Sequence, residues 1–154
     1  MNDNEKILND EFELLKDDLI DKYDELKMRA SGQCADSLEV KTTSTKAELW
    51  GIDYTEYLID GRGPGKFPPI ASIEQWIKDK GISFIESQIS ISSLAFLIAR
   101  KIAREGTQYF KQGGTDLIED VFTPERIQSI IDKLTFIVVD DFVFRGVRAL
   151  QDAA

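Results

Sequence analysis

Apolar side chains first recur at helical spacing near the N-terminus. Over residues 5–29 the intervals are four, three, four and seven positions, so one stripe of a helix carries Leu8, Phe12, Leu15, Leu19 and Leu26. Acidic residues occupy much of the remaining surface, and Gly32 ends the element. Residues 1–31 therefore predict an acidic amphipathic helix. Because the stripe is too narrow to be enclosed on all sides, we expect these five side chains to contact a neighbouring subunit, with packing of the helix on its own domain as the alternative.

The period changes from helical to twofold at Leu38. Leu38, Val40 and Thr42 alternate with polar residues, which is typical of a half-buried strand. Residues 44–46 predict a turn, residues 47–52 a returning strand, and residues 54–59 a further extended or turn segment. An antiparallel hairpin is the simplest interpretation.

Helical spacing returns after a loop at residues 60–69. This loop holds three glycines and three prolines, which exclude a helix or a central strand. Apolar residues from Ile70 to Ile77 then predict a helix that stops at Lys80 and Gly81.

Two further helices are predicted in the second half of the chain. Ser92 or Ser93 caps the first of them, and Gly106 ends it. Thr123 is a helix cap followed by proline at the first helical position. The last helix is open to a second interpretation, because residues 135–144 are also rich in strand formers.

These elements indicate the α+β class: a long N-terminal helix, a small antiparallel hairpin or sheet, and then three or more helices. The length of 154 residues, with 42% apolar and 31% charged residues, predicts a single globular domain. Within it, residues 38–135 form the expected core, and residues 136–154 form a C-terminal extension.

Charge argues against a protein that wraps nucleic acid. The chain has 19 basic and 28 acidic residues, a net charge of −9, whereas phosphate binding requires clustered Lys and Arg. The distribution is uneven: residues 1–30 carry a net charge of −5 and residues 60–114 carry +3. Opposed surfaces of this kind suit head-to-tail contact between copies, and an ordinary solvated surface is the alternative.

The residues for catalysis or metal binding are sparse. The chain has one cysteine, Cys34, and no histidine, which removes the common nucleophile arrangements and the usual zinc ligands. Lys66 is not a phosphate-loop lysine, because Phe67 follows it where serine or threonine is needed. We therefore expect no enzyme, no cofactor and no metal, with a hydrolase that uses only carboxylates as the rival hypothesis. No apolar run is long enough to span a membrane and no signal peptide is evident, so a cytoplasmic protein, or one built into a particle there, is expected.

The glycine–proline loop is the most distinctive segment and the candidate protein-interaction site. Glycines permit unusual backbone angles and prolines restrict the backbone around them, so a stiff projecting loop is expected to present Arg62 and Lys66. The candidate residues are Tyr57, Gly61, Arg62, Pro64, Gly65, Lys66, Pro68 and Pro69. One alternative is a plain connector between a strand and a helix. Another is a soluble adaptor, forming no ring, that binds an anionic partner motif through the two basic side chains.

This loop and its surroundings carry a family resemblance. A tyrosine-containing strand, the motif GRxPGKxPP at residues 61–69 and a short helix ending in WIxxKG at residues 76–81 occur one after another. The combination resembles the tail-completion or neck proteins of tailed bacteriophages. Residues 94–107, with small and basic side chains and a Gly-Thr ending, are similar to that family's next helix. The resemblance covers about residues 38–135.

The resemblance implies a structural subunit of the head–tail connector ring between portal and tail. Its partners would be copies of itself, a portal or adaptor protein, and tail proteins, in a virion assembled in the host cytoplasm. DNA would pass through the ring without specific binding, and an acidic wall suits this because carboxylates repel phosphates. A ring protein of a short-tailed, crAss-like phage is one candidate. The acidic N-terminal helix and the extension after residue 135 are less typical of the family.

Overall fold

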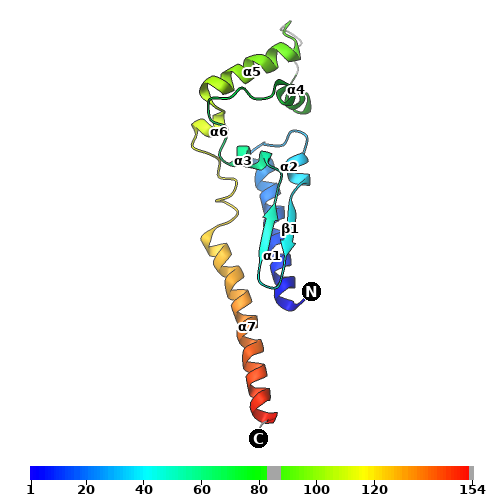
Figure 1. Cartoon of the computed structure of the whole chain (residues 1–154), viewed down its shortest axis with the longest axis vertical. Coiled ribbons are helices and arrows are strands. Elements are labelled where there is room, and N and C mark those ends of the chain that lie inside the picture. The colour runs from blue at the N-terminus through cyan, green and yellow to red at the C-terminus, as the bar shows by residue number, and fades with distance from the viewer. Residues whose placement is uncertain (83–87, 153–154) are drawn as a thin grey trace.

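The structure, a computed structural model, describes residues 1–82 and 88–152. The described part contains these elements in chain order: α1 (Asp3–Glu25), α2 (Gln33–Asp36), β1 (Glu39–Thr42), β2 (Ala47–Trp50), α3 (Tyr54–Ile59), α4 (Ile70–Asp79), α5 (Ile91–Glu105), α6 (Gln108–Lys111) and α7 (Pro124–Asp152). The molecule is elongated, with α4 and α5 at one end and the C-terminal part of α7 at the other (Figure 1). The predicted α+β class, with a long first helix, a hairpin and several later helices, is confirmed.

Helix α1 begins at a side-chain cap and ends earlier than its apolar spacing predicts. The Asn2 side chain accepts a hydrogen bond from the Glu5 backbone N–H at 2.8 Å, which satisfies one of the free donors of the first turn. At the other end Lys27 adopts a left-handed backbone conformation with φ of 56°, and the Met28 N–H donates to the Tyr23 carbonyl at 3.1 Å. Glycine is the usual residue at such a position, so the lysine concealed this helix end in the sequence.

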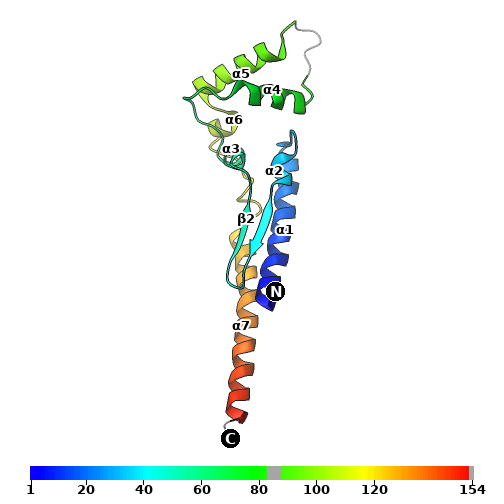
Figure 2. The same cartoon turned by 45° about the vertical axis from the view of Figure 1, so that its right-hand side comes forward.

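The antiparallel hairpin predicted at residues 38–52 is present. Val40 pairs with Leu49 and Thr42 pairs with Ala47, so β1 and β2 run antiparallel, and both lie along α1 (Figure 2). A lone two-stranded hairpin is marginally stable in water. This hairpin is supported because Leu38, Ala47 and Leu49 pack against the apolar cluster around α1.

That cluster is the core of a region that we call the body, made of α1 to α3, the hairpin, residues 115–123 and the first half of α7. Its buried members come from segments far apart in the chain: Leu8, Leu15, Leu19, Tyr23, Met28, Cys34, Ala35, Leu58, Leu117, Val121 and Ile130. Phe12 and Leu26 are partly buried against the same cluster.

The expectation that the stripe of α1 contacts a neighbouring subunit needs correction. Leu8, Leu15 and Leu19 are at most 6% exposed within the single chain, so their side chains are covered by the protein's own hairpin and loops. The periodicity correctly located an apolar face, but it does not indicate whether the same chain or another molecule covers that face.

Residues 54–59 form helix α3, and the prediction of an extended or turn segment is wrong. The segment is only six residues long, so its own propensity is weak and tertiary contacts decide its structure. Helical geometry directs Leu58 into the body core, where it is 4% exposed.

Helices α4 and α5 form a second region, which we call the head. They pack on each other through a separate small cluster of Ile73, Ile77, Ala95 and Ala99. The predicted helix over residues 70–80 is confirmed as α4, and Gly106 ends α5 as expected. The cap of α5 is Ser90 rather than Ser92 or Ser93, because the Ser90 hydroxyl accepts from the Ser93 N–H at 3.2 Å.

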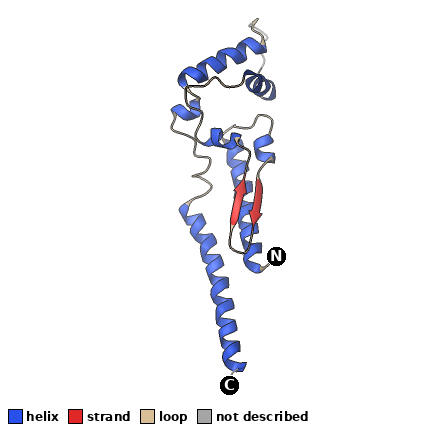
Figure 3. Ribbon diagram, in the orientation of Figure 1, coloured by secondary structure: helices blue, strands red, loops and turns tan. Residues whose placement is uncertain are grey.

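Helix α7 resolves the ambiguity at residues 135–144 in favour of a helix. It begins at Pro124, as predicted, where the Thr123 hydroxyl accepts from the Arg126 N–H at 3.3 Å. The helix continues through the strand-forming run to Asp152, so of the predicted extension 136–154 only residues 153 and 154 lie outside the described part. Its second half extends beyond the N-terminal end of α1, and no described element lies beside it in either view (Figures 1 and 2). Figure 3, in the orientation of Figure 1, shows this half as helix.

Candidate interaction surfaces

The glycine–proline loop is fastened to the end of α5 by backbone hydrogen bonds. The Arg62 N–H donates to the Thr107 hydroxyl at 2.9 Å, and the Thr107 N–H donates back to the Arg62 carbonyl at 2.8 Å. Further along the loop, the Gly65 N–H donates to the Ala103 carbonyl at 2.8 Å. The expected projecting loop is therefore partly wrong, because its backbone is held against the head and joins the head to the body.

Gly61 shows why the loop requires a glycine at its first position. Its φ is 76°, a conformation that other residues rarely adopt. A Cβ atom at this position would lie 2.1 Å from the Phe110 backbone nitrogen and 2.8 Å from the Thr107 hydroxyl oxygen. The close approach of Gly61 to α6 therefore sets the position of the head relative to the body.

The two basic side chains of the loop have different surroundings. The Arg62 guanidinium lies 5.7 Å from the centre of the Tyr57 ring and donates to the Lys66 carbonyl at 3.4 Å, so it is engaged within the loop. The Lys66 side chain is exposed. Pro64 is exposed, Pro68 is buried, and Pro69 stands at the cap position of α4. The predicted interaction residues thus include several that hold the connection together, and Lys66 is the basic side chain that faces solvent.

The outer surface of the head combines exposed apolar and basic side chains. Phe67 from the loop and Phe96 from α5 have ring centres 5.7 Å apart, and both rings are about half exposed. Arg100 and Lys101 lie on the exposed side of α5, one turn further along. Arg100 and Lys101 are among the basic residues that give residues 60–114 their positive net charge.

A cluster of three charges lies where α5 meets α6. The Glu105 carboxylate accepts hydrogen bonds from the Lys111 ammonium and the Arg104 guanidinium, each at 2.8 Å. Lys111 first and Arg104 second lower the pKa of Glu105 to about 2. The cluster is open to water, and it links the C-terminal turn of α5 to the short helix after it.

The acidic surface of the molecule lies on α1, and the turn that follows this helix touches the head, since the Lys80 ammonium donates to the Lys27 carbonyl at 2.8 Å. Asp10, Asp17 and Asp21 are exposed along this helix. Others of its carboxylates pair with basic residues of α7, since Arg126 pairs with Asp18 and Lys133 with Glu11. The seam between α1 and α7 is therefore partly ionic, and the exposed carboxylates remain available to another molecule.

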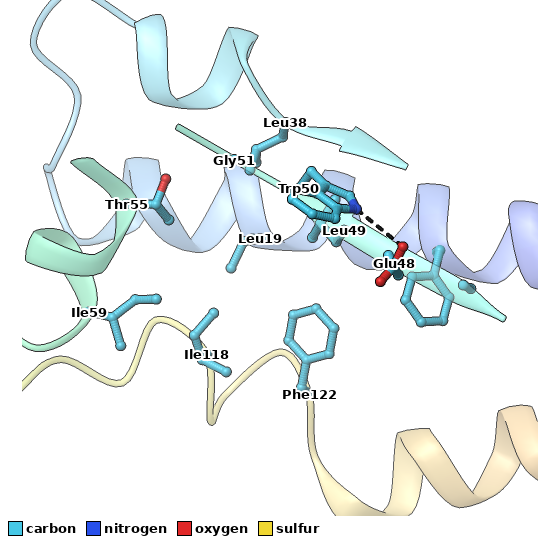
Figure 4. A pocket seen from close by; sticks show the side chains of 12 residues that line it. Leu19, Leu38, Glu48, Leu49, Trp50, Gly51, Thr55, Ile59, Ile118 and Phe122 are labelled. Atoms are coloured by element: carbon cyan, nitrogen blue, oxygen red, sulfur yellow. Dashed lines mark hydrogen bonds between the residues drawn. The ribbon is translucent and has the colours of Figure 1, made fainter. Parts of the chain in front are cut away.

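An open hollow lies between the hairpin and residues 118–122. It has a volume of about 560 Å³ and a mainly apolar lining that includes Leu19, Leu49, Trp50, Ile59, Ile118 and Phe122 (Figure 4). The polar side chains at its rim are Glu48, which accepts from the Trp50 indole at 3.4 Å, and Thr55. This lining suits apolar packing better than the positioning of a polar substrate.

The second half of α7 carries the most exposed apolar side chains of the described chain outside Met1. Phe136, Phe142 and Leu150 are 74%, 76% and 74% exposed, and the valines between them are about half exposed. Sequence reasoning did not select these residues. The available signal is the dense run of apolar residues at 134–144, whose composition also fits a strand.

Metal binding and membrane spanning find no support in the described residues. Among them, no group of three or more acidic or cysteine side chains is arranged to hold a metal ion. Over the same residues, no helix combines the length and apolar character needed to cross a membrane. Comparison of the chain with models of known protein families, with characterised proteins and with solved structures found no match.

Proposed function

We propose that the protein is a structural subunit that works by assembling with copies of itself. The observation that carries this proposal is the exposed apolar second half of α7, which projects beyond the body (Figure 2). Proteins that act as monomers rarely expose contiguous apolar patches of this kind, and such patches mark contact sites. Beyond Phe136 and Ile137, which line an open hollow with α1, this surface is one side of a helix, which suits assembly rather than binding of a small molecule.

The specific assembly that we propose is a ring at the head–tail junction of a tailed bacteriophage. The support is the resemblance at residues 38–135, and above all the GRxPGKxPP loop. In that ring the loop, fastened between α5 and the body, would fix the angle at which the head meets a neighbour. The portal or an adaptor and the tail proteins would lie above and below.

Charge supplies a second contact for this ring. The head exposes Lys66, Arg100 and Lys101, while α1 exposes carboxylates along its length. In a ring, the head of one copy would approach the acidic helix of the next. Opposite charges across such a contact mainly fix orientation and raise the association rate, and salt weakens them.

The proposal is tested by the mass of the assembled protein. Light scattering coupled to size-exclusion chromatography, with and without a portal protein, should find a complex of several copies. Raising the salt concentration should slow its formation. A chain that stays monomeric at every concentration, and that also ignores the portal, would contradict the proposed function.

An adaptor that forms no ring is the competing function. It would bind an anionic motif through Arg62 and Lys66, of which Lys66 is exposed and the Arg62 guanidinium lies beside Tyr57 with one N–H donated to the Lys66 carbonyl. The same mass measurement separates the two functions, because the adaptor stays monomeric until its partner is added.

A further inference from the structure

The two halves of α7 turn their apolar faces in opposite directions. In the first half, Ile127, Ile130, Leu134 and Ile137 lie at spacings of three, four and three, and they are the side chains with reduced exposure on the side of α1. The opposite face of this half is polar and exposed, with Glu125, Gln128, Asp132 and Thr135.

The second half reverses this arrangement. At about 100° per residue, the side that faces α1 continues as Asp141, Arg145 and Arg148, and Arg145 pairs with Asp141 at 2.9 Å. The side that was polar continues as apolar and exposed residues: Val139, Phe142, Val143, Val147 and Leu150. The apolar face of α7 therefore rotates by about half a turn near Phe136.

The reversal excludes the protein's own body as the cover for this face. If the apolar residues of the second half belonged to the same helix face that packs on α1, they would continue the line of Ile130 and Leu134. Instead most of them point to the other side of the helix, and the line itself continues as Asp141, Arg145 and Arg148, with the exposed Phe144 beside them. The cover must come from another molecule on the side away from α1.

The charges of the segment favour a second copy of this chain. Residues 136–151 hold two acidic and two basic residues, Asp140, Asp141, Arg145 and Arg148, so the segment is neutral in a chain of net charge −9. Because the segment has no net charge, it does not attract a strongly acidic or strongly basic partner. Two copies of this acidic chain repel each other least where they meet through a neutral segment. Gly146 lies on the apolar face with nothing within 4 Å of a Cβ at its position, which leaves room for a neighbouring backbone.

The width of the face points to more than one neighbour. It runs from Phe142 through Val139 to Val147 and spans about 140° of the helix circumference, which is wider than the seam of a two-stranded coiled coil. A single seam along a segment about 22 Å long and about 10 Å wide is also small against the roughly 800 Å² per partner of stable interfaces. If each edge of the apolar face packs against a different copy, the whole width of the face is covered and the total contact area is larger than that of one seam.

We propose that residues 136–150 pack against the same segment of two neighbouring copies, in parallel and in register, so that the second halves of α7 form a helical bundle. The parallel orientation rests on the proposed ring, in which a rotation relates the copies. The bundle holds the copies together through Phe142 and Val143, while Asp141, Arg145 and Arg148 lie on the other side of each helix.

A matched pair of variants tests which face is used. Phe142 and Phe144 are 76% and 65% exposed on the same helix, and Phe144 lies outside the apolar face. Phe142→Asp should raise the concentration at which the full-length assembly half dissociates by at least about tenfold. Phe144→Asp adds the same charge and should leave this concentration nearly unchanged. Helix content by circular dichroism should be equal in both variants.

Crosslinking tests the orientation. Phe136→Cys and Leu150→Cys are each treated with a short bis-maleimide, and the wild type, whose Cys34 is buried, gives the background. In a parallel bundle each single-cysteine variant crosslinks to itself. In an antiparallel pair only a mixture of the two variants crosslinks, because identical positions lie about 21 Å apart.

The outcomes separate this inference from the proposed function. If the wild type assembles and Phe142→Asp assembles equally well, the bundle is wrong while the ring stands. If the wild type never assembles, both are wrong. Crosslinking only in the mixture overturns the parallel arrangement. Binding of a monomeric wild type to phosphatidylcholine–phosphatidylglycerol vesicles, lost in Phe142→Asp, would assign the face to a lipid surface and overturn the proposal.

Discussion

The body draws its core from segments spread over the whole chain, whereas the head draws its core from two consecutive helices. In the body, large side chains such as Leu15, Leu117 and Ile130 meet across more than a hundred residues of sequence. In the head, Ile73 and Ile77 of α4 meet Ala95 and Ala99 of α5. The small alanines let the two helices approach closely, but they bury little apolar surface.

This difference indicates that the two regions differ in stability. The body unfolds only when distant segments separate together, so its opening is global. The head has a short-range core and is held to the body by the loop at residues 60–69, by the segment around α6 and by an exposed hydrogen bond from the Lys80 ammonium to the Lys27 carbonyl. It is therefore expected to open locally at a lower free energy. The region that carries the basic surface is therefore the more adaptable of the two.

Equal truncations in the two cores provide the strongest test of this comparison. Leu15 and Ile77 are both fully buried. Leu15→Ala should lower the free energy of global unfolding by about 2–5 kcal/mol, because it leaves a cavity in the shared core. Ile77→Ala should lower the midpoint of global unfolding much less and should instead speed amide exchange within α4 and α5. Denaturant unfolding and hydrogen exchange measure the two effects. Equal global losses in both variants would show that head and body unfold as one unit.

The elements that the sequence predicted are those whose signals are local. The hairpin was evident from the twofold alternation at Leu38 to Thr42, and the start of α7 from a cap and a proline at residues 123 and 124. Helix α3 was missed because six residues carry too little periodicity to outweigh tertiary contacts such as that of Leu58. The end of α1 was missed because a lysine occupies the position where glycine is usual.

The candidate surfaces were less predictable than the elements. The α1 stripe and the α7 run are both apolar, yet the structure covers one and leaves the other open. Spacing defines a face within one helix, while its cover depends on where the other helices lie. The reversal of α7 near Phe136 could have been read from the sequence, but its meaning required knowing that α1 packs against Ile130 and Leu134.

The junction between the two regions can be tested with a pair of glycines. Gly61 and Gly113 have similar φ angles of 76° and 83°, but a Cβ would collide with the Phe110 backbone only at Gly61. Gly113→Ala should cost about 1–2 kcal/mol through backbone strain alone. Gly61→Ala should cost about 1–3 kcal/mol more, because the loop must move away from α6. Thermal or denaturant unfolding measures both, and equal costs would mean that the close approach does not hold the head in place.

The smallest expected effect concerns the charge cluster at the base of the head. The pKa of Glu105 is about 2 in the folded protein, below its ordinary value of 4.5, because Lys111 and Arg104 donate to the carboxylate. A lowered folded-state pKa means that the ionised group stabilises the fold above about pH 4.5, and that this contribution disappears as the pH falls toward 2. The affected contacts join α5 to α6, so the head should respond before the body.

Glu105→Gln removes this titration while keeping the shape of the side chain. The stability difference between wild type and variant should be constant from neutral pH to about 5 and should shrink as the pH falls toward 2. The carboxyl carbon of Glu105, followed by NMR, should titrate with a midpoint near 2. Because the cluster is open to water, 1 M salt should move this midpoint upward. A midpoint near 4.5 at low salt would mean that Lys111 and Arg104 do not hold the carboxylate in solution, and that the base of the head is looser than the hydrogen bonds indicate.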